Sequence, residues 1–220
     1  VIQGQQAHQI RNVLRMTPGE HIIVLDDSGW EMEVELTEVE PYQISGSIIR
    51  RMLARGEPRV KVSLYQAMLK GYHFEFALQK GTELGIIEFV PIITSRCVVA
   101  NLEDIRRKHE RWERIIREAA EQSRRGRLPI LEPATMFQQA LERARDGGGL
   151  TLLPWEDETR TSLKRLLAGS LLPFSINLFV GPEGGFTEEE VRMAQAYGIR
   201  TISLGPRILR AETTGIVAAA

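Results

Sequence analysis

The sequence predicts an α/β fold in which a small β-rich domain, residues 1–57, precedes a mostly parallel sheet with helices, residues 58–220. Two observations carry this prediction. From Arg59 onward, short apolar runs alternate with helical patterns, as they do in parallel α/β proteins. Before that point, closely spaced runs of β-forming residues are separated only by turns. The polar segment Ala54–Pro58 between the two patterns is the expected linker.

In the N-terminal part, a short helical pattern at Ala7–Met16 is followed by β-rich runs at His21–Leu25, Trp30–Val39 and Tyr42–Met52. From Trp30 to Leu36, apolar residues alternate with glutamates, so one face of this strand is apolar and the other is charged. Such half-buried strands joined by turns indicate a small β-barrel.

In the C-terminal part, continuous apolar runs are typical of strands that are buried on both faces of a parallel sheet. Strands are expected at Val60–Ala67, Ile86–Ile93, Leu150–Leu153, Ile176–Val180 and Ile199–Leu204. Helical patterns lie at His73–Leu84, Glu103–Ser123, Ser162–Leu167 and Glu188–Tyr197. The alternation predicts strand-helix-strand units within a single sheet.

Composition limits the possible functions. The only cysteine, Cys97, excludes an internal disulfide, and the four histidines lack metal-ligand spacing, so no metal is expected. Such cysteine usage fits a reducing, cytoplasmic setting. No apolar run is long enough to cross a membrane and no signal pattern opens the chain, so we expect no membrane partner. The net charge of −1 combines 5 basic and 9 acidic side chains in residues 1–57 with 23 and 20 in residues 58–220. Contacts with a polyanion should therefore be local.

A glycine-rich turn, Gly181–Gly185, directly follows the strand that ends at Val180. Its glycines permit positive φ and let a ligand approach the backbone, and Thr187 with Glu190 predicts a capping box for the next helix. A tight turn without a ligand is the alternative. The turn has neither the dinucleotide-binding G-x-G-x-x-G spacing nor the Gly-Lys-Ser/Thr of a phosphate-binding loop.

The following strand also ends in a Gly-Pro loop, which begins at Leu204 and Gly205. Ligands of open α/β sheets bind beyond the carboxyl ends of the strands, so both loops are expected to line one pocket. Arg207 and Arg210 would lie at its mouth, where they could donate to a phosphate or a base carbonyl. Alternatively, they form surface ion pairs with Glu183 or Glu212.

Five segments in a fixed order resemble the RsmE family of 16S ribosomal RNA uridine N3-methyltransferases, which belong to the SPOUT class. The resemblance covers nearly the whole chain, and its last two segments are the most diagnostic. The segments are His8–Met16 with Pro18–Glu20, Gln79–Gly85, Arg111-Trp112 with Glu118–Ser123, Gly181–Phe186, and Leu204–Thr213.

The resemblance implies a SPOUT-type parallel sheet with a C-terminal deep trefoil knot, an N-terminal PUA-like RNA-binding barrel and a homodimer. It also implies that the knot loops bind S-adenosyl-L-methionine. The cofactor-binding residues that it predicts are Leu153, Pro154, Val180, Gly181, Pro182, Glu183, Gly184, Gly185, Leu204, Gly205, Ile208, Leu209 and Thr213. Compared with the family pattern, we expect the first barrel strand to be missing and the last helix to stop early, with both ends trimmed.

The resemblance further implies methylation of N3 of a uridine, uridine 1498, in the 16S rRNA of the small ribosomal subunit. Arg207 or Arg210 would stabilise the negative charge that develops on the base, while the residues leave the general base unassigned. The alternatives are a non-catalytic rRNA-binding protein, an α/β enzyme with another nucleotide-like ligand, and a SPOUT methyltransferase that acts on another RNA.

Five arginines are candidate RNA contacts. Arg11 and Arg15 lie four residues apart in the first helical pattern, and Arg124, Arg125 and Arg127 follow the long charged helix. Within that helix, acids precede bases by four residues, which is typical of an exposed helix stabilised by its own ion pairs. Arginines in either group could meet phosphates, or they could be ordinary surface charges.

Overall fold

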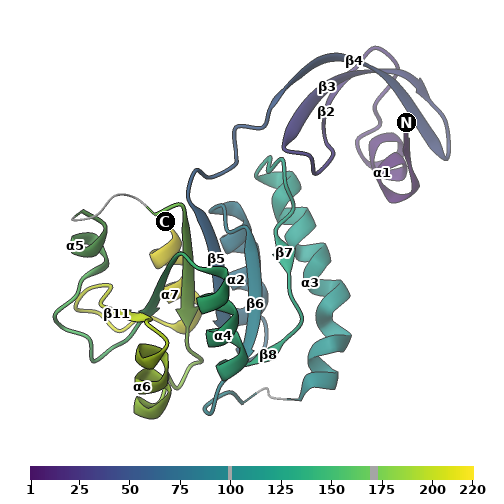
Figure 1. The fold of residues 1–220 in the computed structure, drawn as a ribbon. Helices are drawn as coiled ribbons and strands as arrows, with labels where there is room; N and C mark the ends of the chain where they lie inside the picture. The colour runs from purple at the N-terminus through teal and green to yellow at the C-terminus, as the bar shows by residue number, and fades with distance from the viewer. Residues whose placement is uncertain (99–100, 169–172) are drawn as a thin grey trace. The chain divides into compact units, whose positions relative to one another are not determined.

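The computed structural model describes residues 1–98, 101–168 and 173–220. The chain divides into two compact units. The smaller unit contains Val1–Glu57 together with Arg124–Arg127, and the larger unit contains Pro58–Ser123 and Leu128–Ala220. Figure 1 shows the larger unit as a sheet between helices and the smaller unit as a curved set of strands. The two units are described separately.

The larger unit is built on a seven-stranded sheet in the order β11-β9-β10-β5-β6-β7, with β8 also paired to β6. Every recorded pairing in this sheet is parallel. The strands are β5 (Lys61–Ala67), β6 (Glu88–Ile93), β7 (Ile130–Leu131), β8 (Thr135–Met136), β9 (Leu150–Pro154), β10 (Ser175–Val180) and β11 (Arg200–Ile202). The predicted parallel sheet is therefore confirmed.

Helices cover both faces of this sheet (Figure 1). The core on one face includes side chains of α2 (His73–Glu83), α3 (Leu102–Gln122) and α7 (Ala211–Ala219). The core on the opposite face includes side chains of α4 (Phe137–Gly147) and α6 (Glu188–Ala196). A further short helix, α5 (Leu163–Ala168), follows β9.

The two faces alternate along each strand because successive side chains point to opposite sides. On β10, Leu178 and Val180 enter the core beside α2 and α3, whereas Phe179 enters the core beside α4 and α6. Phe179 stacks on Tyr65 of β5, with ring centroids 4.3 Å apart. These central strands are thus buried on both faces, as their uninterrupted apolar sequences predicted.

The sequence reading missed α4 and the two-residue strands β7 and β8. Helix α4 buries Phe137, Ala140, Leu141 and Ala144, which follow the three-and-four spacing of a helical face. The apolar spacing was therefore present in the sequence, although half of the face consists of small alanines. Two-residue strands are too short to carry an alternating pattern, so β7 and β8 were not predictable in this way.

The smaller unit contains a curled antiparallel sheet in the order β1-β4-β3-β2. Its elements are β1 (Ile2–Gln3), α1 (Gly4–His8), a π-helical turn (Gln9–Val13), β2 (His21–Leu25), β3 (Trp30–Val39) and β4 (Gln43–Leu53). Strands β1 and β2 are opposite edges of this sheet, and no pairing joins them within the described residues. The described strands thus form an open sheet instead of the expected closed barrel.

The first helical segment, residues 4–13, begins and ends three residues before the predicted Ala7–Met16, and so ends before Arg15. Arg15 has φ +56°, a left-handed conformation that a continuing α-helix does not allow. The apolar face of the curled sheet is closed by Ala7 and Ile10, which pack against Leu36 of β3 and Ile44 of β4. The helical segment therefore serves as a lid on the small core.

Asn177 links β10 to the end of α4 and offers a test of the larger unit. Its Nδ2 lies 2.9 Å from the carbonyl oxygen of Gly148, 3.4 Å from that of Ala144 and 3.1 Å from Thr151 Oγ1. We expect Asn177→Ala to lower the free energy of unfolding by about 1–3 kcal/mol, because buried acceptors lose their donor. Urea denaturation measures this change. Gln195→Ala, at an exposed amide on α6, should change stability by less than about 0.5 kcal/mol, and an equal loss in both variants would contradict the role of Asn177.

Candidate functional site

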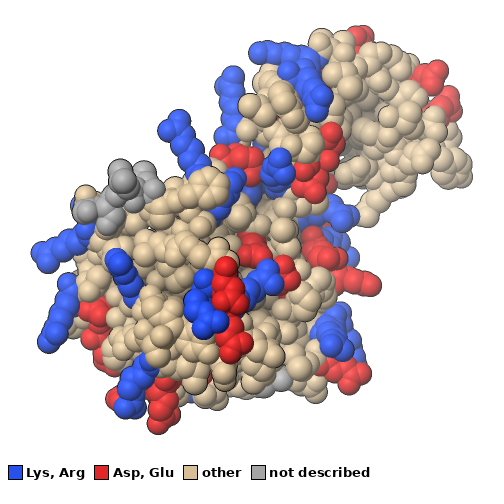
Figure 2. Space-filling view, in the orientation of Figure 1, with Lys and Arg blue, Asp and Glu red and all other residues tan. Residues whose placement is uncertain are grey.

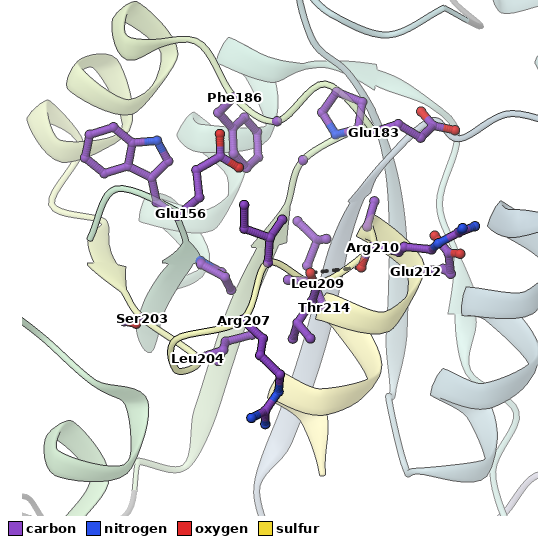
Figure 3. Close-up of a pocket in the computed structure, with 18 of the residues that line it drawn as sticks. Glu156, Glu183, Phe186, Ser203, Leu204, Arg207, Leu209, Arg210, Glu212 and Thr214 are labelled. Carbon is purple, nitrogen blue, oxygen red and sulfur yellow. Dashed lines mark hydrogen bonds between the residues drawn. The ribbon is translucent and has the colours of Figure 1, made fainter. Parts of the chain in front are cut away.

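A pocket of about 420 Å³ opens at the carboxyl edge of the parallel sheet (Figure 3). Its walls come from the segments after β9, β10 and β11, from the first residue of α2, and from the start of α7. These strands are neighbours in the sheet, with β5 beside β10. The pocket therefore lies where ligands of open α/β sheets bind, and its size is within the range of small-molecule sites.

The glycine turn after β10 forms one wall. Gly185 has φ +68°, a conformation that favours glycine. A side chain on Gly181 would lie 3.2 Å from the Phe186 ring, so this position also requires a minimal residue. The predicted capping box is present, since Glu190 N–H donates to Thr187 Oγ1 and Thr187 N–H donates to Glu190 Oε2.

Three contacts hold this turn against neighbouring loops. The second oxygen of the buried Glu190 carboxylate accepts a hydrogen bond from Ser95 N–H at 2.8 Å. Glu183 Oε1 accepts from Lys70 N–H at 2.8 Å. Arg96 donates from Nη1 to the carbonyl oxygen of Gly184 at 2.6 Å. The turn is thus fixed by the loops that follow β5 and β6, which makes its backbone a preorganised surface.

The segments after β9 and β11 lie side by side as the second wall. Trp155 N–H donates to Ile202 O, and Ser203 N–H donates to Thr161 O. Glu158 accepts from Thr161 N–H and from the Thr201 hydroxyl, and these hydrogen bonds hold the pKa of the Glu158 carboxyl below its ordinary value. The carboxylate therefore remains ionised and cross-links this wall at neutral pH.

Acidic and basic side chains occupy different parts of the pocket. Figure 3 shows Glu156 beside Phe186 at one end and Arg210 beside Glu212 at the other, with Arg207 directed away from Glu156. Arg207 and Arg210 are exposed, and no ion pair to either is present among the described residues. Among these residues, neither arginine thus forms the surface ion pair with Glu183 or Glu212 that the sequence left open as an alternative.

Most of the predicted cofactor-binding residues lie in this pocket. Those that line it are Pro154, Val180, Gly181, Pro182, Glu183, Gly185, Leu204, Gly205, Ile208 and Leu209, together with Arg207 and Arg210. Leu153, Gly184 and Thr213 do not line it. Leu153 is buried in the core beside Phe179, and Thr214, one residue after Thr213, lies on the wall instead.

The sequence did not identify several residues of the pocket wall. The most important of these are His73, Glu156 and Glu212. His73 begins α2 after β5, and the carboxyl end of β5 lies at the same edge as those of the other wall strands. The order of the strands was the missing information, because the sequence does not state that β5 is adjacent to β10.

The five arginines predicted to contact RNA differ in exposure. Arg11, Arg15, Arg124 and Arg127 are exposed, whereas Arg125 is only 3% exposed. Arg125 donates from Nε and Nη2 to both carboxylate oxygens of Glu57, at 3.0 and 3.2 Å. Because its guanidinium is buried in this bidentate pair, Arg125 is a structural residue and the prediction of an RNA contact for it is wrong.

Charge on the larger unit is mixed. Figure 2 shows basic and acidic side chains interspersed over the visible face of this unit. Along the long helix α3, Arg107 pairs with Glu103 and Asp104, in keeping with the predicted exposed helix. Within the described residues, no helix is long and apolar enough to cross a membrane, and no cluster of potential ligands could hold a metal ion.

Residues 56–220 match the family described as the RNA methyltransferase domain. The chain is 38% identical to ribosomal RNA small subunit methyltransferase E of Bacillus subtilis, in an alignment that covers 99% of this chain and 86% of that protein. It is 36% identical to the protein of the same name from Synechocystis, with 98% of this chain and 69% of that protein covered.

A solved structure has the same fold over almost the whole chain. It is ribosomal RNA small subunit methyltransferase E from Neisseria gonorrhoeae bound to S-adenosyl methionine, which is 30% identical to this chain. The TM-score is 0.87, and the alignment covers 97% of this chain and 86% of the other. The likeness therefore extends over almost the whole of this chain.

Gly185 tests the conformation of the glycine turn. We expect Gly185→Ala to lower the free energy of unfolding by about 1–2 kcal/mol, because alanine is strained at a left-handed φ and its Cβ would lie about 3.4 Å from the Glu156 carboxylate. Gly184→Ala is the matched control, since its new Cβ would meet only the flexible Arg96 side chain. Urea unfolding curves compare the two, and equal stability would show that the turn does not require a left-handed residue at 185.

Proposed function

Because the chain belongs to the ribosomal RNA small subunit methyltransferase E family, we propose that it methylates N3 of a uridine in the 16S rRNA of the small ribosomal subunit. Uridine 1498 is the proposed nucleotide. The methyl donor is S-adenosyl-L-methionine, which is bound in the solved structure of the Neisseria gonorrhoeae relative. The observation that carries the proposal is the pocket at the carboxyl edge of the sheet, whose walls are the loops after β9, β10 and β11.

The cofactor is held chiefly by backbone groups in this proposal. Gly181 and Gly185 allow the ligand to approach the turn after β10, while Leu204 and Leu209 supply apolar contact from the loop before α7. Pro154 closes the pocket from β9. Most small-molecule sites likewise combine apolar walls with a few polar groups. Such walls suit a ligand that is partly apolar and partly hydrogen-bonding.

Methyl transfer from a sulfonium to a ring nitrogen needs the two atoms to be aligned, so positioning supplies much of the rate. The target base must also leave its stack in the RNA. Arg207 and Arg210 are unpaired cations at the pocket mouth within the described chain. Arg210 lies at the N-terminus of α7, beside the pocket, and in this proposal it stabilises the anion that forms on the uracil carbonyls.

Three further features belong to the proposal. The segment between β11 and α7 would be threaded as a deep trefoil knot, and the curled sheet of the smaller unit would act as a PUA-like RNA-binding domain. A homodimer is supported by exposed apolar side chains at the start of α2, Tyr72 just before the helix and Phe76 within it, since apolar patches mark interaction sites. The cytoplasm, where small ribosomal subunits are made, is the proposed location.

A non-catalytic rRNA-binding protein would not need a ligand pocket, so the pocket favours the enzyme. A methyltransferase for another RNA shares all the cofactor contacts and differs only in its substrate. Isothermal calorimetry with S-adenosylmethionine and transfer of labelled methyl to small subunits that lack the modification separate these possibilities. Mapping of the labelled nucleotide to any position other than a uridine N3 would refute the proposal.

Arg210→Ala tests the stabilising role of the arginine. We expect methyl transfer to fall about 10²–10³-fold, the typical cost of losing one donor to a developing oxyanion, with little change in cofactor affinity. Arg200→Ala, at an exposed arginine of β11 outside the pocket, is the matched control. Full activity of Arg210→Ala under single-turnover conditions would remove Arg210 from the mechanism.

Arg11→Ala tests RNA binding by the smaller unit. Loss of one phosphate contact should weaken binding to small subunits and reduce the slope of log K against log salt by about 1. Arg192→Ala, at an arginine of α6 that pairs with Glu188, should leave this slope unchanged. Filter binding over a range of salt concentrations measures both, and an unchanged slope for Arg11→Ala would assign the RNA contacts elsewhere.

A further inference from the structure

The His73 ring and the Glu212 carboxylate are in contact on the wall of the pocket, and neither has a role in the reaction described above. His73 Nδ1 lies 3.0 Å from Glu212 Oε1. The two residues come from different helices, His73 from the start of α2 and Glu212 from the first turn of α7. Both line the pocket. The side chain of Glu212 is 10% exposed and that of His73 is 28% exposed, so the carboxylate is enclosed while the imidazole is open to the cavity and to water.

The contact with Glu212 favours one tautomer of the His73 ring. A carboxylate accepts hydrogen bonds, so Nδ1 carries the hydrogen that faces Glu212. In the neutral imidazole, Nε2 then has a free lone pair. Tyr72 stacks on the ring, with centroids 4.7 Å apart, and limits its rotation. An imidazole whose tautomer and plane are set in this way is arranged to accept a proton at Nε2.

The other acids of the pocket are weaker candidates for this task. Glu156 and Glu183 are exposed, and Glu183 Oε1 already accepts the Lys70 N–H. An ordinary carboxylate is too weak a base to match a ring N–H near neutral pH, whereas imidazole is the side chain whose ordinary pKa lies nearest to that pH. Arg207 and Arg210 remain protonated and only donate.

We propose that His73, held by Glu212, accepts the N3 proton of the target uridine during methyl transfer. This inference rests on the proposed function. The N3–methyl bond forms as the methyl–sulfur bond of the cofactor breaks, and the sulfur keeps that electron pair in neutral S-adenosylhomocysteine. The N3 proton passes to Nε2 of His73 and then to solvent, so the positive charge of the sulfonium leaves as this proton. Glu212 is a positioning residue that stabilises the transient imidazolium.

The charges around the pair are consistent with this direction of transfer. Glu212 on α7 favours the protonated ring after the transfer, and Glu183 in the turn after β10 adds a second negative charge to the wall. Arg210, which directly precedes α7, carries a positive charge that opposes this effect of the acids. On the α3 side of α2, Arg111 is held by Glu75 at 2.7 Å.

The test measures methyl transfer to small ribosomal subunits by the full chain, with S-adenosylmethionine affinity determined separately by calorimetry. His73→Gln should lower the single-turnover rate about 10²–10⁴-fold, the usual contribution of a general base, with cofactor affinity unchanged. In the unmodified enzyme the rate should rise with pH and level off once the imidazole is neutral. In His73→Gln it should keep rising with hydroxide, because only free uridine anion reacts. Added imidazole should restore part of the rate to His73→Ala.

Two further variants complete the test. Glu212→Gln should shift the levelling-off to lower pH and reduce the rate less than His73→Gln does, because the neutral partner stabilises imidazolium less. His109→Gln is the matched control, since His109 makes a similar pair with Glu113 at 3.6 Å on α3, outside the pocket. An unchanged rate and pH profile in His73→Gln would overturn the proposal while leaving the proposed function intact. Absence of methylated uridine with the unmodified enzyme would instead refute the proposed function itself.

Discussion

The pocket depends on the buried carboxylate of Glu190. One of its oxygens accepts the N–H of Thr187 and the other accepts the N–H of Ser95, so a single side chain joins the start of α6 to the loop after β6. A turn with three glycines in five residues would otherwise lose much conformational entropy on ordering. Because Glu190 fixes its far end, the turn presents its backbone to a ligand already ordered. The contacts of Lys70 and Arg96 extend the same restraint to the middle of the turn.

Local sequence determined what could be predicted about this site. The capping box of Thr187 and Glu190, the glycine turn and the parallel strands before it are all encoded within a few adjacent residues, and the structure contains them. His73 was not predictable in this way. It reaches the pocket only because β5 lies beside β10, a pairing between residues more than 100 positions apart. The sequence places the charge of Glu212 near the second loop, but it does not indicate a partner for it on α2.

Arg125 illustrates the opposite error. A cluster of arginines after a long charged helix resembles an RNA-binding segment, and the sequence does not distinguish one arginine from the next. The structure does, because Arg125 turns inward to Glu57 while Arg124 and Arg127 remain exposed. Breaking a buried pair costs about 3–5 kcal/mol, so Arg125 contributes to the stability of the smaller unit. A cluster of charged residues therefore predicts an exposed basic surface. Only the burial of each side chain shows which arginines belong to that surface.

The division of charge in the pocket connects the fold to the chemistry. Two of the acids have fixed partners, Glu183 through Lys70 and Glu212 through His73, whereas Arg207 and Arg210 have no ion-pair partner in the part of the chain that is described. Fixed negative charge suits a cofactor with a sulfonium centre, since it is present before the ligand arrives and needs no rearrangement. Exposed arginines at the mouth suit a polyanion, which neutralises them on binding. In the proposed function, the cofactor and the nucleic acid are thus drawn to the same edge of the sheet by charges of opposite sign, and the reacting atoms would meet where the two sets adjoin, beside His73 and Glu212.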